Sequence, residues 1–412
     1  MIRKIIYVLC TLVCSVILCS CQETNPDEQS DATDVAITSH TTESQTDDSS
    51  EMTNQDEFVM RRVELPVTMD TSCAKLINSF DYTEIIQSEQ TEQCSLVAID
   101  HDDVIIQKST DTLDDNAIWE FYKYNVSNGT LTKLSGNVPR CNYSMATYAL
   151  VNGVIYSVCE SSSSERFHFS VDLRKNLVAV QKTMPVIRGA GNLYEESFYM
   201  SFAFDEHSYI EKWYELGNEV VNHIIRHDGD HAKEVVTQKG ILEYAFSNQK
   251  IYELVRDDSR HMRYVHIRDA EGNLESTLYL PEVDAAANAI ASEYLSILDF
   301  NVFGDYLQVN VRDEDKMAET CFLYHLKQKT VDQLQDCRFL QPAQATDSNI
   351  ENLYFYSMNS GETGILYNLY RLDREGNIVL LAENLRMFSS MVTDGKNAAY
   401  LDQNKLYFIS GD

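Results

Sequence analysis

Three histidines at intervals of four are the first residues in this sequence whose type and spacing suggest chemistry. His223, His227 and His231 lie with Asp228 and Asp230 in the stretch NHIIRHDGDHAKE. On a helix this spacing would place the three imidazoles on one face, and two His with two Asp would suit zinc. The stretch instead has the pattern of a β-hairpin with an Asp-Gly turn, which puts His227 and His231 on either side of the turn and exposed. We therefore expect no metal and no cofactor.

Carboxylates are so abundant that their presence alone assigns no site. The chain has 64 Asp and Glu, and eleven of them precede residue 58, which leaves 53 in residues 58 to 412. Acidic turns at Asp205, Asp257 and Asp313 lack the D-x-[DN]-x-[DN]-G spacing of a calcium loop. A pair of carboxylates would suit a glycoside hydrolase, but with so many acids some pairs are inevitable. No P-loop, nucleophile elbow or dinucleotide-binding glycine motif is present, so no catalytic residue is assigned.

One pair of cysteines is a candidate disulfide. If the chain turns between Gln328 and Lys329, Cys321 lies opposite residue 336, next to Cys337. A bridge between Cys321 and Cys337 would then need a small shift of register and would stabilise the fold by about 3 kcal/mol. Apolar neighbours predict that the other cysteines after residue 57 are buried thiols: Cys73, Cys94, Cys141 and Cys159.

A repeated β-structure must position these residues. Six stretches place a polar turn between two apolar runs, as β-hairpins do: YKYNVSNGTLTKL, FSVDLRKNLVAV, IIRHDGDHAKEVV, VHIRDAEGNLESTL, LYHLKQKTVDQL and NLYRLDREGNIVLL. Gly129 in the first turn and Gly376 in the last are 247 residues and five intervals apart, so the period is about 49 residues. A second pair of strands precedes each hairpin. Four antiparallel strands at this interval are typical of a β-propeller blade.

The repeat predicts an all-β fold for residues 58 to 412, a seven-bladed β-propeller, with six or eight blades as alternatives. The chain ends after the inner two strands of its last blade. Residues 58 to 87, with FVMRRVEL and DYTEII, are free to supply the outer strands of that blade. Sharing a blade between the two ends would close the ring and protect a sheet edge. An array of β-sandwiches is the other interpretation.

Two features depart from the repeat. PEVDAAANAIASEYL, residues 281 to 295, predicts a helix capped by Asp284. It would be a longer connection between blades four and five, or else a small lid or docking element. Trp119 and Trp213 precede hairpins of different blades, where aromatic rings could stack on sugars or contact a partner. We expect them in the packing between blades.

The N-terminal residues carry a different pattern. Arg3 and Lys4 precede an uncharged apolar segment, residues 5 to 20, which as a helix would rise about 24 Å and fall short of the roughly 30 Å of hydrocarbon in a bilayer. The segment leads into Leu18-Cys19-Ser20-Cys21, which resembles the lipobox of bacterial lipoproteins. The resemblance implies a signal peptide at residues 1 to 20 and a diacylglyceryl thioether on Cys21. The chain would then be anchored to the cell membrane on its extracytoplasmic face.

Residues 21 to 57 have the composition of a disordered tether. They contain eleven Asp and Glu, no Lys or Arg and no aromatic residue, and such a segment cannot bury enough apolar surface to fold. As a flexible coil it would separate anchor and domain by about 30 to 36 Å. Of the net charge of −31, the signal contributes +2 and the tether −11, which leaves −22 for residues 58 to 412. This charge argues against nucleic acid as a partner.

These patterns predict a membrane-anchored lipoprotein whose propeller binds a protein or an extracellular ligand. The alternative is an envelope enzyme acting on carbohydrate or peptide, with carboxylates at the propeller axis. A structural component of an envelope complex is a third class. Convergent polar groups with perturbed carboxylates near the axis would favour the enzyme, whereas an uncharged aromatic patch on one face would favour a protein partner.

Overall fold

The computed structural model shows a chain built mostly of β-strands. The structure describes residues 58–69, 75–81, 93–109, 118–139, 148–160, 166–182, 196–203, 208–216, 220–228, 231–239, 243–257, 262–289, 295–313, 318–340, 342, 350–361, 364–385, 391–402 and 405–411. Within these ranges one short helix, α2 (Pro281–Ala289), accompanies the strands. The all-β expectation is confirmed at this level.

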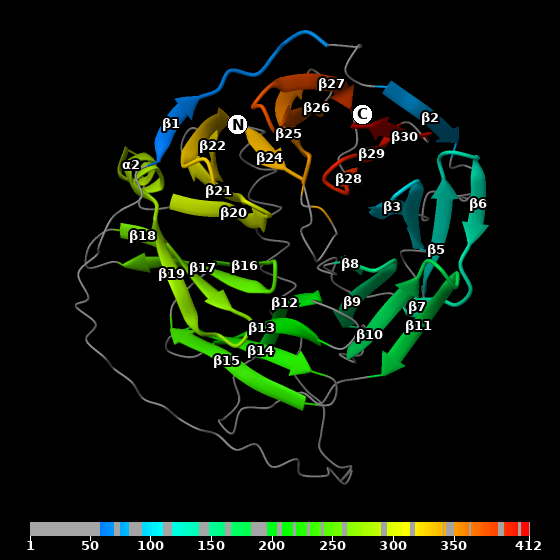
Figure 1. Ribbon diagram of the computed structural model, residues 1–412, viewed down its shortest axis with the longest axis horizontal. Coiled ribbons are helices and arrows are strands. Elements are labelled where there is room, and N and C mark those ends of the chain that lie inside the picture. The colour runs from blue at the N-terminus through cyan, green and yellow to red at the C-terminus, as the bar shows by residue number, and fades with distance from the viewer. Residues whose placement is uncertain are drawn as a thin grey trace, which may run out of the picture. The chain divides into compact units, whose positions relative to one another are not determined.

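The described strands form seven separate sheets, which we number along the chain (Figure 1). Sheet 1 contains β3 (Gln93–Asp100), β4 (Asp103–Ser109), β5 (Ile118–Asn125) and β6 (Thr130–Lys133), with β7 (Val138–Pro139) beside β5. Sheet 2 contains β8 (Ala149–Val151), β9 (Val154–Glu160), β10 (Arg166–Asp172) and β11 (Leu177–Lys182). Sheet 3 contains β12 (Glu196–Ala203), β13 (Ser208–Leu216), β14 (Val220–Asp228) and β15 (His231–Lys239), and sheet 4 contains β16 (Glu243–Ser247), β17 (Lys250–Asp257), β18 (Met262–Asp269) and β19 (Leu274–Tyr279).

The remaining three sheets follow the same plan, and two of them include a strand from the N-terminal region. Sheet 5 contains β20 (Leu295–Phe303), β21 (Tyr306–Asp313), β22 (Ala318–His325), β23 (Thr330–Gln335) and β1 (Val59–Arg62). Sheet 6 contains β24 (Cys337–Phe339), β25 (Asn352–Gly361), β26 (Gly364–Asp373) and β27 (Ile378–Leu385). Sheet 7 contains β28 (Met391–Thr393), β29 (Ala398–Asp402), β30 (Lys405–Ser410) and β2 (Lys75–Asp81).

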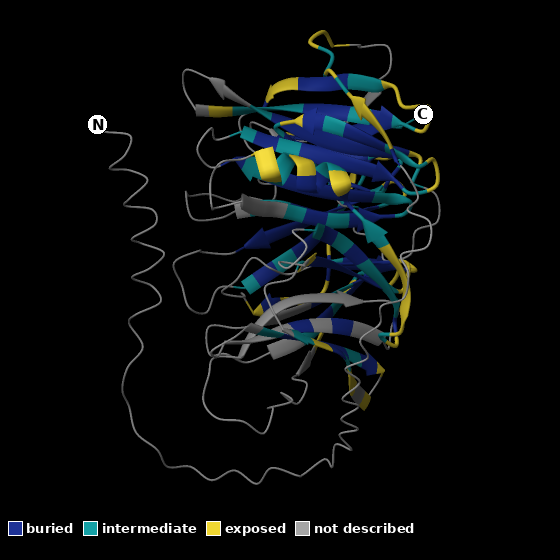
Figure 2. Ribbon diagram, turned by 90° about the vertical axis from the view of Figure 1, so that its left-hand side faces the viewer, coloured by how far each residue is buried: buried dark blue, intermediate teal, exposed yellow. Residues whose placement is uncertain are grey.

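Apolar side chains pack between successive sheets. Val104, Ile105 and Ile106 on β4 are each fully buried, because the neighbouring sheets cover both faces of the strand and leave no polar face to alternate with. Figure 2 shows the same pattern, with buried residues on most strands and exposed residues at turns, on the helix and on outer strands such as β19.

The apolar clusters link the sheets in a cyclic series. One cluster joins sheets 1 and 2, another sheets 2, 3 and 4, and a third sheets 4 and 5. Two more join sheet 5 to sheet 6 and sheet 6 to sheet 7. The last contains residues of sheet 7 and sheet 1, and there β28 and β29 lie beside β3 (Figure 1).

The N-terminal residues contribute to two different sheets. β2 pairs antiparallel with β30, from Lys75 opposite Ser410 to Asp81 opposite Lys405. β1 pairs parallel with β23 in sheet 5. The prediction that FVMRRVEL completes the last blade is therefore wrong: Phe58 packs in the core between sheets 4 and 5, and Val63 and Leu65 pack against the core between sheets 5 and 6. Sheet 7 also takes three strands from the C-terminal region, and not two as predicted.

Helix α2 follows sheet 4 and precedes sheet 5. It begins at Pro281, a residue suited to the first helical position, so the prediction of Asp284 as the cap is wrong. Asp284 Oδ1 instead accepts a hydrogen bond of 3.0 Å from Arg263 Nη1 on β18. Tyr324 on β22 donates to Glu282 at 3.0 Å, so the helix is bound to both sheets. No helix in the described ranges is long and apolar enough to cross a membrane.

Candidate functional site

The hairpin turns carry a recurring polar residue at the end of the third strand. This residue is Asn or Asp in five sheets: Asn125, Asp172, Asp228, Asp269 and Asp373. Asp269 Oδ1 accepts hydrogen bonds from the backbone N–H groups of Glu271 and Asn273 at 3.0 and 2.8 Å. Such side-chain-to-backbone bonds stabilise the turn itself.

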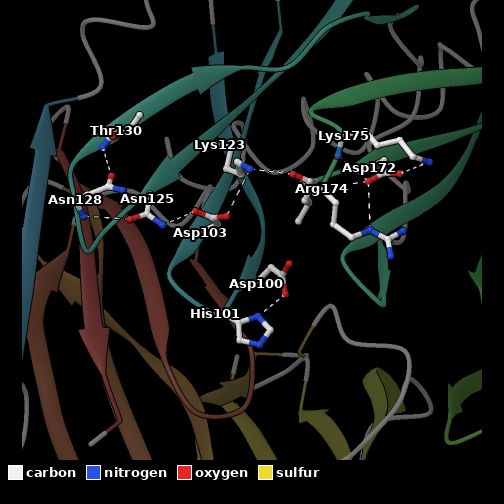
Figure 3. A network of polar contacts seen from close by, with 11 residues as sticks. Asp100, His101, Asp103, Lys123, Asn125, Asn128, Thr130, Asp172, Arg174 and Lys175 are labelled. Atoms are coloured by element: carbon white, nitrogen blue, oxygen red, sulfur yellow. Dashed lines mark hydrogen bonds and ion pairs between the residues drawn. The ribbon is translucent and has the colours of Figure 1, made fainter.

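Figure 3 shows the polar network where these turns meet in sheets 1 and 2. Lys123 Nζ donates to the Leu173 carbonyl at 2.9 Å and lies 3.7 Å from Asp103 Oδ2. Asn125 Nδ2 donates to Asp103 Oδ1 at 2.8 Å. Asp172 accepts from the backbone N–H of Lys175 at 3.1 Å. The carboxylates in this network serve turns and the contact between two sheets, so a structural role accounts for them.

The three histidines lie in a hairpin, as predicted, but in different environments. Asp228 on β14 pairs with His231 on β15. His227 is only 1% exposed, so its predicted exposure is wrong; both faces of β14 are covered by neighbouring sheets. His223 Nδ1 lies 2.5 Å from Glu234 Oε1. Among the described residues, no group of three or more His, Cys, Asp or Glu could hold a metal ion.

Some of the acidic turn residues and tryptophans singled out in the sequence lie within the described residues, and others do not. Asp257 and Asp313 end β17 and β21, whereas Asp205 lies outside the described residues. Trp119 is 6% exposed and packs edge-on against Phe169, with ring centroids 6.4 Å apart. Its predicted place in the packing between sheets is confirmed. The side chain of Trp213 lies outside the described part.

Cys321 and Cys337 are both fully buried free thiols in the structure. The predicted register is wrong, because His325 pairs with Thr330 across a four-residue turn and Cys321 therefore lies opposite Leu334. Burial raises the pKa of both thiols, which makes them poor nucleophiles near neutral pH. Cys94 is also free. Cys21, Cys73, Cys141 and the side chain of Cys159 lie outside the described residues.

Charged side chains from sheets 3 to 6 come together in what we call the inter-sheet charge cluster: Lys212, Glu243, Asp299, Glu319 and Arg338. Glu243, Asp299 and Arg338 lie on β16, β20 and β24, the first strands of their sheets. Arg338 Nε lies 3.3 Å from Asp299 Oδ2, and Arg338 Nη2 lies 3.1 Å from Glu319 Oε2. The Asp299 and Arg338 side chains are 27% and 30% exposed, so solvent reaches both.

Burial and mutual repulsion perturb these groups. Burial raises the pKa of Asp299; Arg338 partly offsets the rise and Glu319 adds to it. Burial also raises the pKa of Glu243, with Lys212 opposing and Asp299 reinforcing the effect. The pKa of Lys212 falls to about 8, again mainly through burial. Two neighbouring carboxylates thus hold protons more tightly than usual, and they lie between two cations.

One oxygen in the cluster stands out. Asp299 Oδ2 is buried and accepts no hydrogen bond, because the N–H of the nearby Arg338 Nε donates to Glu319 Oε1. Buried acceptors are normally satisfied. Glu319, in contrast, receives hydrogen bonds from Asn310 Nδ2 and from Arg338. The unsatisfied oxygen therefore belongs to the more accessible of the two acids.

The cluster continues into sheet 4. Lys212 Nζ lies 4.7 Å from the centre of the Tyr244 ring. Tyr244 donates to Glu253 at 3.2 Å, and Arg268 Nε donates to the other oxygen of Glu253 at 3.1 Å. Glu253 is fully buried, so this part stabilises the sheet and is closed to ligands.

A second buried charged group joins β1 to sheet 5. Arg61 donates from Nε and Nη2 to Asp332 at 2.6 and 2.8 Å, and His325 Nε2 lies 2.8 Å from the same carboxylate. Burial alone would raise the pKa of Asp332, but the hydrogen bonds from His325 and Arg61 hold it below the ordinary value. The group binds the N-terminal strand to the fold.

No sequence motif pointed to the inter-sheet charge cluster. A usable signal existed: β16, β20 and β24 each carry a charged residue within or beside an apolar run, in LEYAF, ILDFNVF and CRFL. Nothing in the sequence shows that these three strands are neighbours. That information is tertiary.

The described part belongs to the class of all-β repeat folds built from four-stranded antiparallel sheets, as in β-propeller domains. The sequence matches no protein-family profile and no curated protein. Among solved structures, it is similar to the β-propeller domain of the trilobed protease from Pyrococcus furiosus, with 13% identity and a TM-score of 0.47 over 77% of this chain and 96% of that one. An oligogalacturonate lyase in complex with manganese gives 11% identity and a TM-score of 0.48 over 77% of this chain and 90% of that one.

Oligopeptidase B from Leishmania major gives 8% identity and a TM-score of 0.46 over 78% of this chain. This chain spans 44% of that peptidase. At these identities and TM-scores the similarities establish neither activity nor substrate.

Proposed function

We propose that this chain is an extracytoplasmic lipoprotein, anchored through Cys21, whose residues 58 to 412 form a closed seven-bladed β-propeller. The seven sheets, the apolar cluster shared by sheets 7 and 1, and the pairing of β2 with β30 support the closed ring. The lipobox and the acidic tether, which support the anchor, lie outside the described residues.

We propose further that the propeller binds a small charged ligand at the inter-sheet charge cluster. The observation that carries this proposal is the meeting of Glu243, Asp299 and Arg338 from three sheets, with an accessible acid whose buried oxygen accepts no hydrogen bond. Ligand sites commonly combine a few convergent polar groups in this way. The large apolar side chains exposed in the described part are aliphatic or Met, with no aromatic among them, which argues against a broad protein-binding patch.

An envelope hydrolase is the second candidate, and one specific observation favours it. A general acid must hold its proton near neutral pH, and the pKa values of both Glu243 and Asp299 are raised. Most glycoside hydrolases also use a pair of Asp or Glu carboxyl groups as their catalytic residues, and Glu243 and Asp299 lie on neighbouring strands.

The ligand proposal is tested by ligand-observed NMR on residues 22 to 412 with a defined panel of amino acids, amino sugars, uronic acids and dicarboxylates. We expect one class to bind, and Asp299→Asn and Arg338→Met each to weaken that binding by about tenfold or more, because each removes one partner of a partly buried charge pair. Arg226→Met is the matched control, since Arg226 pairs with Asp228 and Glu271 outside the cluster.

Two outcomes would contradict the proposal: no binding by any class, or binding unchanged in both cluster variants. Hydrolase activity is assayed separately with nitrophenyl glycosides as substrates. Nitrophenol release that persists in Glu243→Gln would exclude Glu243 as its acid.

A further inference from the structure

The segment from residue 59 to residue 69 exposes an unusual share of apolar surface. Of the eight exposed large apolar side chains in the described ranges, four lie in this segment. They are Val59, Met60, Val67 and Met69, which are 64%, 48%, 88% and 44% exposed. We call the segment the 59–69 edge.

This exposure belongs to a segment that is firmly held. The Arg61–Asp332 pair binds it to sheet 5, and Val63 and Leu65 pack against the core between sheets 5 and 6. Met69 forms an isolated bridge with Leu380 on β27. The fold therefore buries one side of the segment and presents the other to solvent.

β1 is also the last strand of its sheet. In the order β1-β23-β22-β21-β20 it has a partner on one side only, and all four of its residues are exposed. Exposed apolar edges are normally covered or made charged. The 59–69 edge has three charged residues, Arg61, Arg62 and Glu64, but its large apolar side chains stay exposed beside them.

The charge of the edge is opposite to that of the domain. Arg61, Arg62 and Glu64 give it a net charge of +1, whereas residues 58 to 412 carry −22. Arg62 is exposed. Apolar side chains beside a cation suit an anionic lipid surface, where the apolar groups enter the interface and the cation meets phosphate.

The position of the edge in the chain identifies what covers it. The leader and tether end at residue 57, directly before it. We propose that the 59–69 edge rests on the membrane to which the chain is anchored, with Val59 and Met60 at the acyl boundary and Arg62 at the headgroup phosphates. This inference depends on the proposed anchor for its biological setting.

The contact needs little intrinsic affinity. Four partly buried apolar side chains contribute a few kcal/mol at most, which alone would give weak binding. A tether holds the edge at an effective concentration in the millimolar range, so a weak contact is sufficient to orient the domain. The acidic remainder of the domain is repelled by anionic lipid, which favours the same orientation.

The experiment places a tryptophan at the edge and measures its quenching by lipid. Residues 22 to 412 behind a hexahistidine tag are held on vesicles of phosphatidylcholine and phosphatidylglycerol with a nickel-chelating lipid. Met60→Trp is compared with Leu177→Trp, a matched control at a site 42% exposed on β11 of sheet 2. Doxyl-labelled phosphatidylcholine is the quencher, and the emission of the unsubstituted chain is subtracted.

We expect quenching of the tryptophan at position 60 to exceed that at position 177 by about twofold or more, since only the first lies at the interface. Adding Arg62→Glu should remove most of the difference. Equal quenching at the two positions would overturn the proposal. A blue shift at position 60 that grows with protein concentration without vesicles would show that a second copy covers the edge, and would overturn it as well.

The lipid anchor at Cys21 is tested in a separate experiment, because in the vesicle experiment the hexahistidine tag takes its place. In cells, Cys21→Ala in the full chain should release the protein from the membrane fraction or leave it unprocessed. An unchanged mass and unchanged fractionation would refute the anchor while leaving the vesicle result to decide the lipid affinity of the edge.

Discussion

Asp332 connects two groups that are far apart in the sequence. The carboxylate is 3% exposed and is held by Arg61, 271 residues earlier, and by His325. Its pKa lies below the ordinary value despite burial, because these hydrogen bonds favour the ionised form. The stabilisation is therefore fully present above the unfolded-state pKa of about 3.9 and is lost as the pH falls through the lower folded-state value.

Asp332→Asn should lower the free energy of unfolding by about 2 to 3 kcal/mol at pH 7, because it leaves Arg61 and His325 without their anion. The difference from the unsubstituted chain should narrow as the pH falls below about 4, because the carboxylate is then protonated in the unfolded chain while it is still ionised in the folded chain. Urea unfolding of the variant and the unsubstituted chain, at pH 7 and below about pH 4, measures the difference in their free energies of unfolding. Asp305→Asn is the control, since Asp305 pairs with Lys327 on the surface and should change the value by less than about 0.5 kcal/mol. A pH-independent difference would contradict the assignment.

At the scale of elements, the residue that ends the third strand of sheets 1, 2, 4 and 6 accepts a hydrogen bond from the backbone of the turn that follows. In sheet 6, Asp373 Oδ1 accepts from the Asn377 N–H at 2.8 Å and Oδ2 accepts from Asn377 Nδ2 at 2.9 Å. Gly376 in this turn has a φ of 88°, which side chains with a Cβ rarely adopt. The turn chemistry thus sets the pairing next to the turn, where Leu372 on β26 lies opposite Ile378 on β27.

Asp373→Ala should lower the free energy of unfolding by about 1 kcal/mol, the usual contribution of such side-chain hydrogen bonds. Glu375→Ala, on the exposed part of the same turn, is the matched control and should be close to neutral. Thermal and urea unfolding of the two variants provide the measurement. Similar losses for both would mean that the Asp373 hydrogen bonds are not the cause.

At the scale of the whole molecule, the N-terminal region completes sheets built from distant parts of the chain. β1 covers the edge of sheet 5 and β2 covers β30 in sheet 7. The fold therefore depends on the residues of β1 and β2.

Truncation should separate these contributions. A chain starting at residue 58 should keep the melting temperature of the longer chain, and one starting at residue 64 should melt lower, because it lacks Phe58 and the Arg61–Asp332 pair. A chain starting at residue 82 should melt lower still and self-associate, since the edge of β30 is then unpaired. Scanning calorimetry and gel filtration are the measurements. An unchanged melting temperature in the shortest chain would refute a role for β2.

Local patterns predicted much of the fold. The six hairpins read from turn residues and alternating runs are antiparallel strand pairs in the structure, such as β18 with β19. The predicted packing of Trp119 was also correct. One failed prediction is an offset: the register of Cys321, where the turn is two residues longer than assumed. Another concerns strand neighbours, because β1 joins sheet 5 and not the last blade.

The sequence by itself determined the hairpins, the repeat and the division of charge, because these depend on residues close together in the chain. Only the tertiary structure decided that β1 joins sheet 5, and that Glu243, Asp299 and Arg338 share one cluster. Those pairings depend on which strands become neighbours, and strand neighbours are chosen by packing across hundreds of residues, for which a local pattern carries no signal.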